Sequence, residues 1–169
     1  MSPRRLFAAF GVEMAHSFKR PLFYIAAAII ALTSFGLSSG QMQISSGDSS
    51  VGGTKAWITS EFAQTQTWTY LTLLYFAVLL AIAAGLTLLR DREQKVDVIL
   101  HATPLTPAEY VWGRFLAVMA LFGVLFAWQA LSAALFNHLV PNGSAVEIRG
   151  PFAWASYFRP VFVVGLPFV

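Results

Sequence analysis

Long apolar stretches separated by short charged ones dominate the pattern of this chain. Residues 68–89, WTYLTLLYFAVLLAIAAGLTLL, form an uncharged run of 22 residues. As a helix this run would measure about 33 Å, against a hydrocarbon core of roughly 30 Å. Residues 21–37 and 115–140 are two further apolar runs that could cross a bilayer. A fourth run begins at Arg159 and is still apolar at Val169, so we expect it to continue beyond this chain.

The segment before the first apolar run has the pattern of an amphipathic helix. In residues 4–20, RRLFAAFGVEMAHSFKR, a turn of about 100° per residue gathers the large apolar side chains in one arc. We expect this helix to lie in the headgroup layer, anchored by Phe10 and Phe18, with the chain turning into the bilayer at Pro21. Packing on a soluble neighbour is the alternative. The apolar arc comprises Leu6, Phe7, Phe10, Met14 and Phe18, and the polar side comprises Arg5, Glu13, His16, Lys19 and Arg20.

The amino-acid composition indicates that much of the chain lies in a lipid bilayer and not in water. The sequence is 57% hydrophobic and 11% charged, whereas soluble domains usually carry about 25% charged residues. The formal net charge of +3 is small, so nucleic acid is not an expected partner. The absence of cysteine excludes disulfides, thiolate catalysis and cysteine-bound metals.

The charges that lie between the second and third apolar runs identify a loop. Residues 90–97 contain six charged groups, and each would cost about 2.5 to 3.5 kcal/mol at the centre of a bilayer. Most of the lysines and arginines lie in this loop or before the first run, so the positive-inside rule places the loop and the N-terminus in the cytoplasm. A cleaved signal peptide is not favoured, because charged residues separate the N-terminal arginines from the apolar run.

Several patterns that resemble catalytic or binding motifs fail on inspection. GDSSVGGT, residues 47–54, matches a phosphate-binding loop except that Gly53 replaces the lysine, so we interpret residues 38–56 as a flexible connector. The histidines His16, His101 and His138 lack the spacing of a metal site, and no G-x-S-x-G motif is present. We therefore assign no catalytic, metal or cofactor-binding residue.

Gln129, near the middle of the third apolar run, is the informative polar residue within the spans. An amide in hydrocarbon needs a hydrogen-bond partner or a wet cavity. Two interpretations stay open, an interhelical hydrogen bond and a place on a translocation path. In the second span, Ala77, Ala81 and Gly85 repeat every four residues, which favours close helix packing.

The charged loop also has internal order. KVDVILHA predicts a short helix that presents Val96, Ile99 and Leu100 on one side and ends before Pro104. A second helix should begin at Pro107, with Thr106 as its N-cap and with Glu109 completing a capping box. This second helix leads directly into the third span. Its expected anchors at the membrane interface are Tyr110, Trp112 and Arg114.

The segment LLRDREQKVDVILHATPLTPAEYVWGRFLA resembles the connection between the second and third spans of type-2 ATP-binding-cassette exporter permeases. In that family an E-R-E type run leads to L-L-x-x-P-[LV]-[ST]-x-x-x-[YIL]-x-x-G-[KR]. The N-terminal FKRPLFYIAAAIIAL is similar to the start of the family's first span, which follows an amphipathic elbow helix. Lys95 departs from the family, where many members have a small residue. The pattern is carried, with three residues instead of two between Leu100 and Pro104, by Arg92, Glu93, Ile99, Leu100, Pro104, Leu105, Thr106, Tyr110, Gly113 and Arg114.

The resemblance implies a membrane-spanning permease of a bacterial ATP-driven exporter in the inner membrane, a transport component rather than an enzyme. Its loop would rest in a cleft of a separate cytoplasmic ATPase, which alone would bind ATP and magnesium. A second permease half, identical or different, would pair with this one. A subgroup with a similar HATPL segment continues into a zinc aminopeptidase domain. The residues expected to couple to the ATPase are Arg92, Glu93, Asp97, Ile99, Leu100 and Pro104.

The predicted fold class is all-α, a multi-pass transmembrane helical bundle with an interfacial elbow helix and a cytoplasmic coupling helix. A membrane anchor or signalling protein with a soluble partner is the alternative function. An intramembrane enzyme has little to use beyond Gln129, Asn137 and His138. The expected parts are an elbow helix (4–20), span 1 (21–38), an extracytoplasmic loop (39–67), span 2 (68–89), a coupling loop and helix (90–109), span 3 (110–140), an extracytoplasmic loop (141–158) and the start of a truncated span 4 (159–169).

Overall fold

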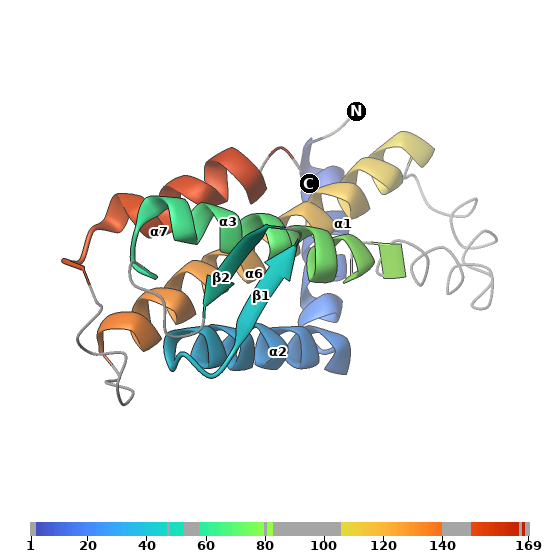
Figure 1. The fold of residues 1–169 in the computed structure, drawn as a ribbon. Helices are drawn as coiled ribbons and strands as arrows, with labels where there is room; N and C mark the ends of the chain where they lie inside the picture. The colour runs from blue at the N-terminus through green and yellow to red at the C-terminus, as the bar shows by residue number, and fades with distance from the viewer. Residues whose placement is uncertain are drawn as a thin grey trace.

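The computed structural model describes residues 3–46, 48–52, 58–79, 81–82, 106–139, 150–165 and 167, and most of them are helical (Figure 1). Short π-helical turns, η1 and η3, continue two of the helices. The elements in chain order are α1 (Pro3–Phe18), α2 (Pro21–Ser38), β1 (Gln43–Ser46), β2 (Ser49–Gly52), α3 (Glu61–Leu71), η1 (Thr72–Phe76), α6 (Pro107–His138), α7 (Trp154–Pro160) and η3 (Val161–Gly165).

Among the residues that the structure describes, two helices are long and apolar enough to cross a membrane. They are α2, with a mean hydropathy of 1.8, and residues 108–138 of α6, with a mean hydropathy of 2.0. These helices coincide with the first and third predicted spans. The predicted second span, 68–89, begins inside α3 and continues through η1, but most of its second half lies outside the described residues.

Helices α2 and α6 run in the same direction along each other. The indole Nε1 of Trp128 donates a hydrogen bond to the carbonyl oxygen of Ala27 at 3.0 Å. Further along both helices, the Ser38 hydroxyl donates to the carbonyl oxygen of Phe136 at 2.7 Å. The residue numbers rise together, so the two helices are parallel, as expected for two spans separated by one span of opposite direction.

Helix α3 and its continuation η1 pack on α6 in an antiparallel direction. Trp68 of α3 packs its ring edge-to-face on Phe126, with the centroids 5.5 Å apart, while Phe76 of η1 reaches back to Phe122. Phe76 and Phe126 are the closest pair of this group, at 4.6 Å and an interplanar angle of 78°. Such edge-to-face pairs add about 0.5 to 1.5 kcal/mol beyond the burial of their area.

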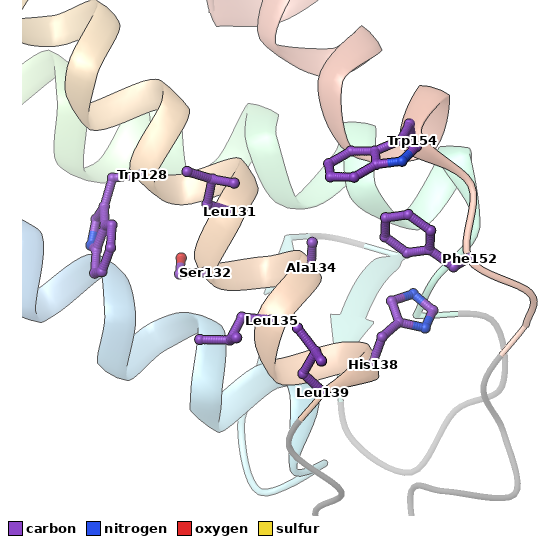
Figure 2. Close-up of a pocket in the computed structure, with 9 residues that line it drawn as sticks. All are labelled: Trp128, Leu131, Ser132, Ala134, Leu135, His138, Leu139, Phe152 and Trp154. Atoms are coloured by element: carbon purple, nitrogen blue, oxygen red, sulfur yellow. The ribbon is translucent and has the colours of Figure 1, made fainter.

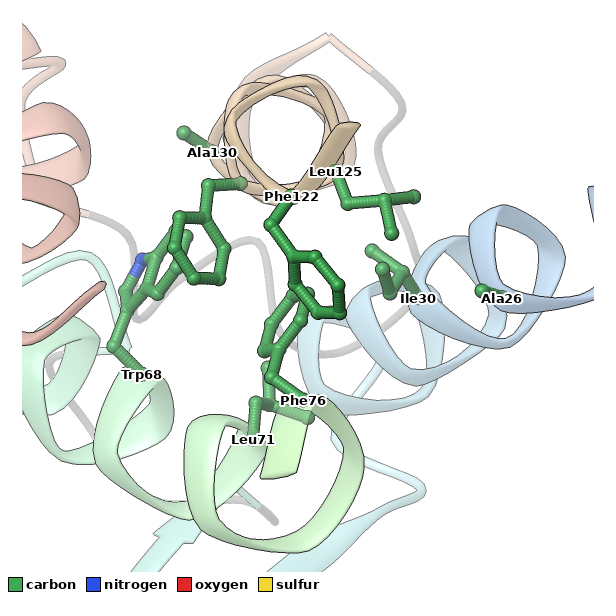
Figure 3. Close-up of a cluster of buried hydrophobic side chains, with 9 residues drawn as sticks. Ala26, Ile30, Trp68, Leu71, Phe76, Phe122, Leu125 and Ala130 are labelled. Atoms are coloured by element: carbon green, nitrogen blue, oxygen red, sulfur yellow. The ribbon is translucent and has the colours of Figure 1, made fainter. Parts of the chain in front are cut away.

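These aromatic rings form the centre of the core, where α2, α3, η1 and α6 meet (Figure 3). The side chains of Trp68, Phe76 and Phe122 point toward one another, and Ile30 closes the cluster from the side of α2. The buried core comprises Ala26, Ile30, Trp68, Leu71, Phe76, Phe122, Leu125, Phe126 and Ala130.

Helix α1 crosses the direction of the other helices and packs on the first turns of α6 (Figure 1). Its bounds match the predicted amphipathic helix closely, but one residue of the predicted polar side faces a neighbouring helix. The sequence pattern assigned Glu13 to the polar side, whereas in the structure Glu13 faces α6 and pairs with Arg114. Phe7, in the predicted apolar arc, is exposed and is available to face lipid.

The segment expected to be a flexible connector contains regular structure. β1 and β2 pair as an antiparallel hairpin in which Ile44 lies opposite Val51. Before the hairpin, Gly40 has a φ of 75°, a left-handed conformation that glycine adopts readily after a helix end. The described residues are therefore all-α apart from one hairpin. In this hairpin a strand follows β1, whereas in a phosphate-binding loop a helix follows the strand and the loop.

Helix α3 begins at Glu61, seven residues before the predicted start of the second span. The cause is local, because Ser60 acts as an N-cap and its hydroxyl accepts a hydrogen bond from the Ala63 amide at 3.2 Å. The expected extracytoplasmic loop, 39–67, thus includes a hairpin and the first turns of α3.

Candidate functional site

The residues expected to contact an ATPase, Arg92, Glu93, Asp97, Ile99, Leu100 and Pro104, lie outside the described residues. Their role stays a prediction from the sequence. The structure resumes at Thr106, immediately before α6, and it describes how the end of this segment joins the bundle.

The start of α6 is fixed by a capping box. The Glu109 amide donates to the Thr106 hydroxyl at 3.3 Å, and the Thr106 amide donates to a carboxylate oxygen of Glu109 at 3.1 Å. Pro107 occupies the first helical position, where its missing N–H leaves no bond unmade. The chain therefore enters α6 in a defined direction at the residue where the predicted coupling segment ends.

An ion-pair cluster joins this first part of α6 to α1 and to the start of α2. One carboxylate oxygen of Glu13 lies 3.5 Å from Nε of Arg114, and the other lies 3.4 Å from a terminal nitrogen of Arg20. The Glu13 side chain is only 13% exposed. The guanidinium of Arg114 also lies over the Tyr110 ring, 4.5 Å from its centroid. Arg114, expected to contact lipid phosphates, is thus engaged inside the protein together with Tyr110.

Gly113 permits the close approach of α1 and α6. A Cβ atom built on Gly113 would lie 2.9 Å from Cβ of Ala9 and 3.3 Å from the carbonyl oxygen of Leu6. Because real Cβ atoms essentially never approach so closely, no other residue fits here without a shift of α1. The sequence contained Gly113 as part of a family pattern, but only the structure identifies its neighbour.

The remaining expected anchors differ in their surroundings. Phe10 is half-buried, and Phe18 packs edge-to-face on Phe23 of α2 with the centroids 5.0 Å apart. Trp112 is 52% exposed and packs its ring edge-to-face on Phe115. Trp112 thus points away from the bundle, and its place at the membrane interface stays a prediction.

Gln129 belongs to a buried polar seam between α2 and α6. Its side chain is 1% exposed, and its Oε1 accepts a hydrogen bond of 3.5 Å from the Ser34 hydroxyl. Ser34 also shares a hydrogen bond of 3.1 Å with Ser132. A cavity of about 20 Å³ adjoins Gln129 and is also lined by Gln64 and Asn137. This volume holds about one water molecule. The bond from Ser34 is an interhelical hydrogen bond, and a place of Gln129 on a translocation path stays a prediction.

The seam includes a signal that the sequence analysis missed. Ser34 and Ser38 lie four residues apart in an apolar helix, so both hydroxyls face the same neighbour. Polar side chains at this spacing in a span commonly bond across to another helix. At the end of the seam, the amide of Asn137 donates to the Tyr157 hydroxyl at 3.2 Å, which attaches α7 to α6.

An apolar pocket of about 510 Å³ opens beside the last turns of α6 (Figure 2). The rings of Phe152 and Trp154 form its wall on one side, while Trp128 stands at the opposite end near α2. His138 lies at the edge of the pocket and packs edge-to-face on Phe152 with the centroids 5.0 Å apart. The pocket has no signal in the sequence, because it brings together residues from two separate segments of the chain.

Within the part of the chain that the structure describes, no group of three or more His, Asp or Glu side chains could hold a metal ion. The chemistry of the described residues is that of packing, hydrogen bonding and ion pairing between helices.

Comparison with protein families gives one match. Residues 54–157 match the family described as "Fluoroquinolones export permease protein Rv2686c-like". The match covers more than half of the chain and runs from before α3, through the predicted coupling segment and α6, into α7. No curated protein and no solved structure matches the chain.

Proposed function

The chain belongs to the Rv2686c-like family of export permeases, and we propose that it is the membrane-spanning permease subunit of a bacterial ATP-driven exporter. The family match is the observation that carries this proposal. A separate ATP-binding-cassette ATPase binds ATP and magnesium, and residues 90–109 transmit its movement to α6. The family's description names fluoroquinolones, so planar aromatic drugs of this class are the proposed cargo.

At each end of the bundle, a polar contact joins two segments that are expected on the same side of the membrane. This supports a multi-pass arrangement with a cytoplasmic N-terminus. At one end, Glu13 of the elbow helix pairs with Arg114, which follows the coupling segment, so two segments expected in the cytoplasm contact each other. At the other end, the Gly150 amide donates to the Thr59 hydroxyl at 2.9 Å. Residues 59 and 150 come from the two segments expected outside the membrane.

The length of α6 supports a role in transmitting movement. Its 32 residues measure about 48 Å at about 1.5 Å per residue, well beyond a hydrocarbon core of roughly 30 Å. The helix therefore extends beyond the core as one continuous element. Its capped first turn receives the coupling segment directly, and Gly113 brings α1 into contact one turn later.

An exposed apolar stripe on α6 supports the proposed partners, the bilayer and a second permease half. Apart from one gap between Leu116 and Val124, the exposed side chains recur every three or four residues, so they follow one side of the helix. Water is a poor solvent for such a continuous apolar surface. The outer stripe of α6 comprises Trp112, Leu116, Val124, Trp128, Leu131, Leu135 and Leu139, of which all but the first three also line the pocket beside the end of α6.

Co-purification tests the proposal. We would purify the protein in mild detergent and identify its companions by mass spectrometry, with Leu100→Asp beside the unmodified protein. This substitution places a charge on the side of the predicted coupling helix that faces the ATPase. Val98→Asp makes the same kind of change on the opposite side of that helix and serves as the control.

We expect an ATP-binding-cassette ATPase with the unmodified protein and with Val98→Asp, and its loss with Leu100→Asp. The purified permease alone should not bind ATP. An intact protein that carries no ATPase would instead favour a membrane anchor or signalling protein. Equal retention of the ATPase by all three proteins would place the contact elsewhere.

A further inference from the structure

The pocket beside the last turns of α6 has the size and form of a small-molecule site. Its volume of about 510 Å³ lies within the roughly 300 to 1,000 Å³ of drug-binding pockets. Small side chains, Ser132 and Ala134, line it between larger ones, so the surface of α6 is hollowed there. Leu131 and Leu135 border this hollow on the same helix.

The walls of the pocket favour aromatic ligands over flexible aliphatic ones. Phe152 packs edge-to-face on Trp154 with the centroids 4.8 Å apart, and Trp154 in turn lies 5.5 Å from Phe158. These contacts hold the rings in place, while Trp154 remains 60% exposed. At the opposite end, the bond from Trp128 to the carbonyl oxygen of Ala27 fixes that indole as well. Fixed rings bind a flat ring system with little loss of conformational entropy.

The described lining offers few polar partners to a ligand besides its aromatic rings. Among the described residues that line it, His138 and Ser132 are the polar side chains with titratable or hydroxyl groups, and none is acidic or an arginine or lysine. A ligand cation would therefore interact with the faces of the tryptophan rings, which attract cations most strongly among aromatic side chains. His138 is held by a contact of 2.8 Å between its Nε2 and the Tyr157 hydroxyl.

We propose that this pocket binds the cargo, a planar aromatic molecule that carries a protonated amine, at the end of α6 opposite the coupling segment. This inference rests on the proposed function and assigns a site to it. The position suits cargo that is about to leave, because the pocket lies beside the segment expected outside the membrane.

The test is a binding measurement with norfloxacin, a fluorescent fluoroquinolone with a protonated amine, on the protein and its ATPase in lipid nanodiscs. Fluorescence anisotropy would give the dissociation constant. Trp154→Leu removes the ring from the pocket wall, whereas Trp154→Phe keeps an aromatic face. Phe62→Leu removes an exposed ring on α3 that is not among the residues lining the pocket, and is the control.

We expect Trp154→Leu to weaken norfloxacin binding by about tenfold, which corresponds to one lost aromatic contact. Trp154→Phe should keep most of the affinity, and Phe62→Leu should bind like the unmodified protein. Equal affinity for Trp154→Leu and the unmodified protein would overturn the pocket assignment. Norfloxacin that fails to bind to a permease carrying its ATPase would overturn the cargo assignment and leave the permease function intact.

Competition distinguishes an aromatic site from a general apolar one. Decyltrimethylammonium carries a cation on a flexible alkyl chain, and we expect it to displace norfloxacin only at much higher concentration than a second aromatic amine. Equal displacement by the two compounds would show that the pocket accepts alkyl chains and would overturn the aromatic assignment.

Discussion

Replacing Gly113 by alanine tests the contact between α1 and α6. The new Cβ would lie 2.9 Å from Cβ of Ala9, 3.3 Å from the carbonyl oxygen of Leu6 and 3.4 Å from the backbone nitrogen of Phe10. Two of these three atoms belong to the backbone, so a side-chain rotation cannot relieve the overlap. Helix α1 must shift away from α6 as a whole.

Gly123 provides a matched control on the same helix. An added Cβ at Gly123 meets no atom of the described chain within 4 Å. Both substitutions gain the same helix propensity, about 1 kcal/mol, so this gain cancels in the comparison. The remaining difference is the cost of overpacking at Gly113, about 1 to 3 kcal/mol. For a chain of this size each kcal/mol corresponds to about 2 to 4 °C in Tm.

The assay is thermal unfolding of the purified protein in detergent, followed by tryptophan fluorescence. We expect the Tm of Gly113→Ala to lie about 2 to 12 °C below that of Gly123→Ala. A Gly113→Ala protein as stable as Gly123→Ala would refute the close approach of α1 to α6, and with it the packing of the elbow helix described above.

Two further substitutions test the polar contacts. Glu13→Gln removes a partner from Arg114 inside the α1 contact and should lower the free energy of unfolding by about 1 to 3 kcal/mol. Glu61→Gln breaks an exposed pair and should change it by less than about 1 kcal/mol; equal effects in denaturant titrations would contradict this difference. Gln129→Leu should change the free energy of unfolding by less than about 1 kcal/mol, because Ser34 keeps its hydrogen bond to Ser132 of α6. It should also preserve norfloxacin export from cells. Loss of export with unchanged stability would instead place Gln129 on the translocation path.

Features that depend on neighbouring residues in the sequence could be predicted. The apolar run that begins at Pro21 ends near Ser38, and α2 has these bounds. The capping box was predicted because Glu109 follows Thr106 by three residues, and the structure contains both of its hydrogen bonds. Each of these features is determined within one or two helical turns, where the sequence carries the whole cause.

Features that depend on distant residues could not be predicted. Helical periodicity assigned Glu13 to a polar face, but its partner Arg114 lies about one hundred residues further along the chain. The local sequence pattern of an amphipathic helix is therefore the same whether its polar residue faces water or a buried counterion. The apolar pocket also depends on such pairing, since Trp128 and Trp154 come from different helices.

The contacts between α2 and α6 limit which movements the proposed coupling can produce. At one end Glu13 joins Arg20, at the start of α2, to Arg114 of α6. At the other end Ser38 bonds to the backbone of α6, and the aromatic core fills the space between. Separating the two helices would break polar contacts at both ends. A push delivered at the start of α6 should therefore move α1, α2 and α6 as one unit, and alternating access should open on the outer stripe of α6 instead.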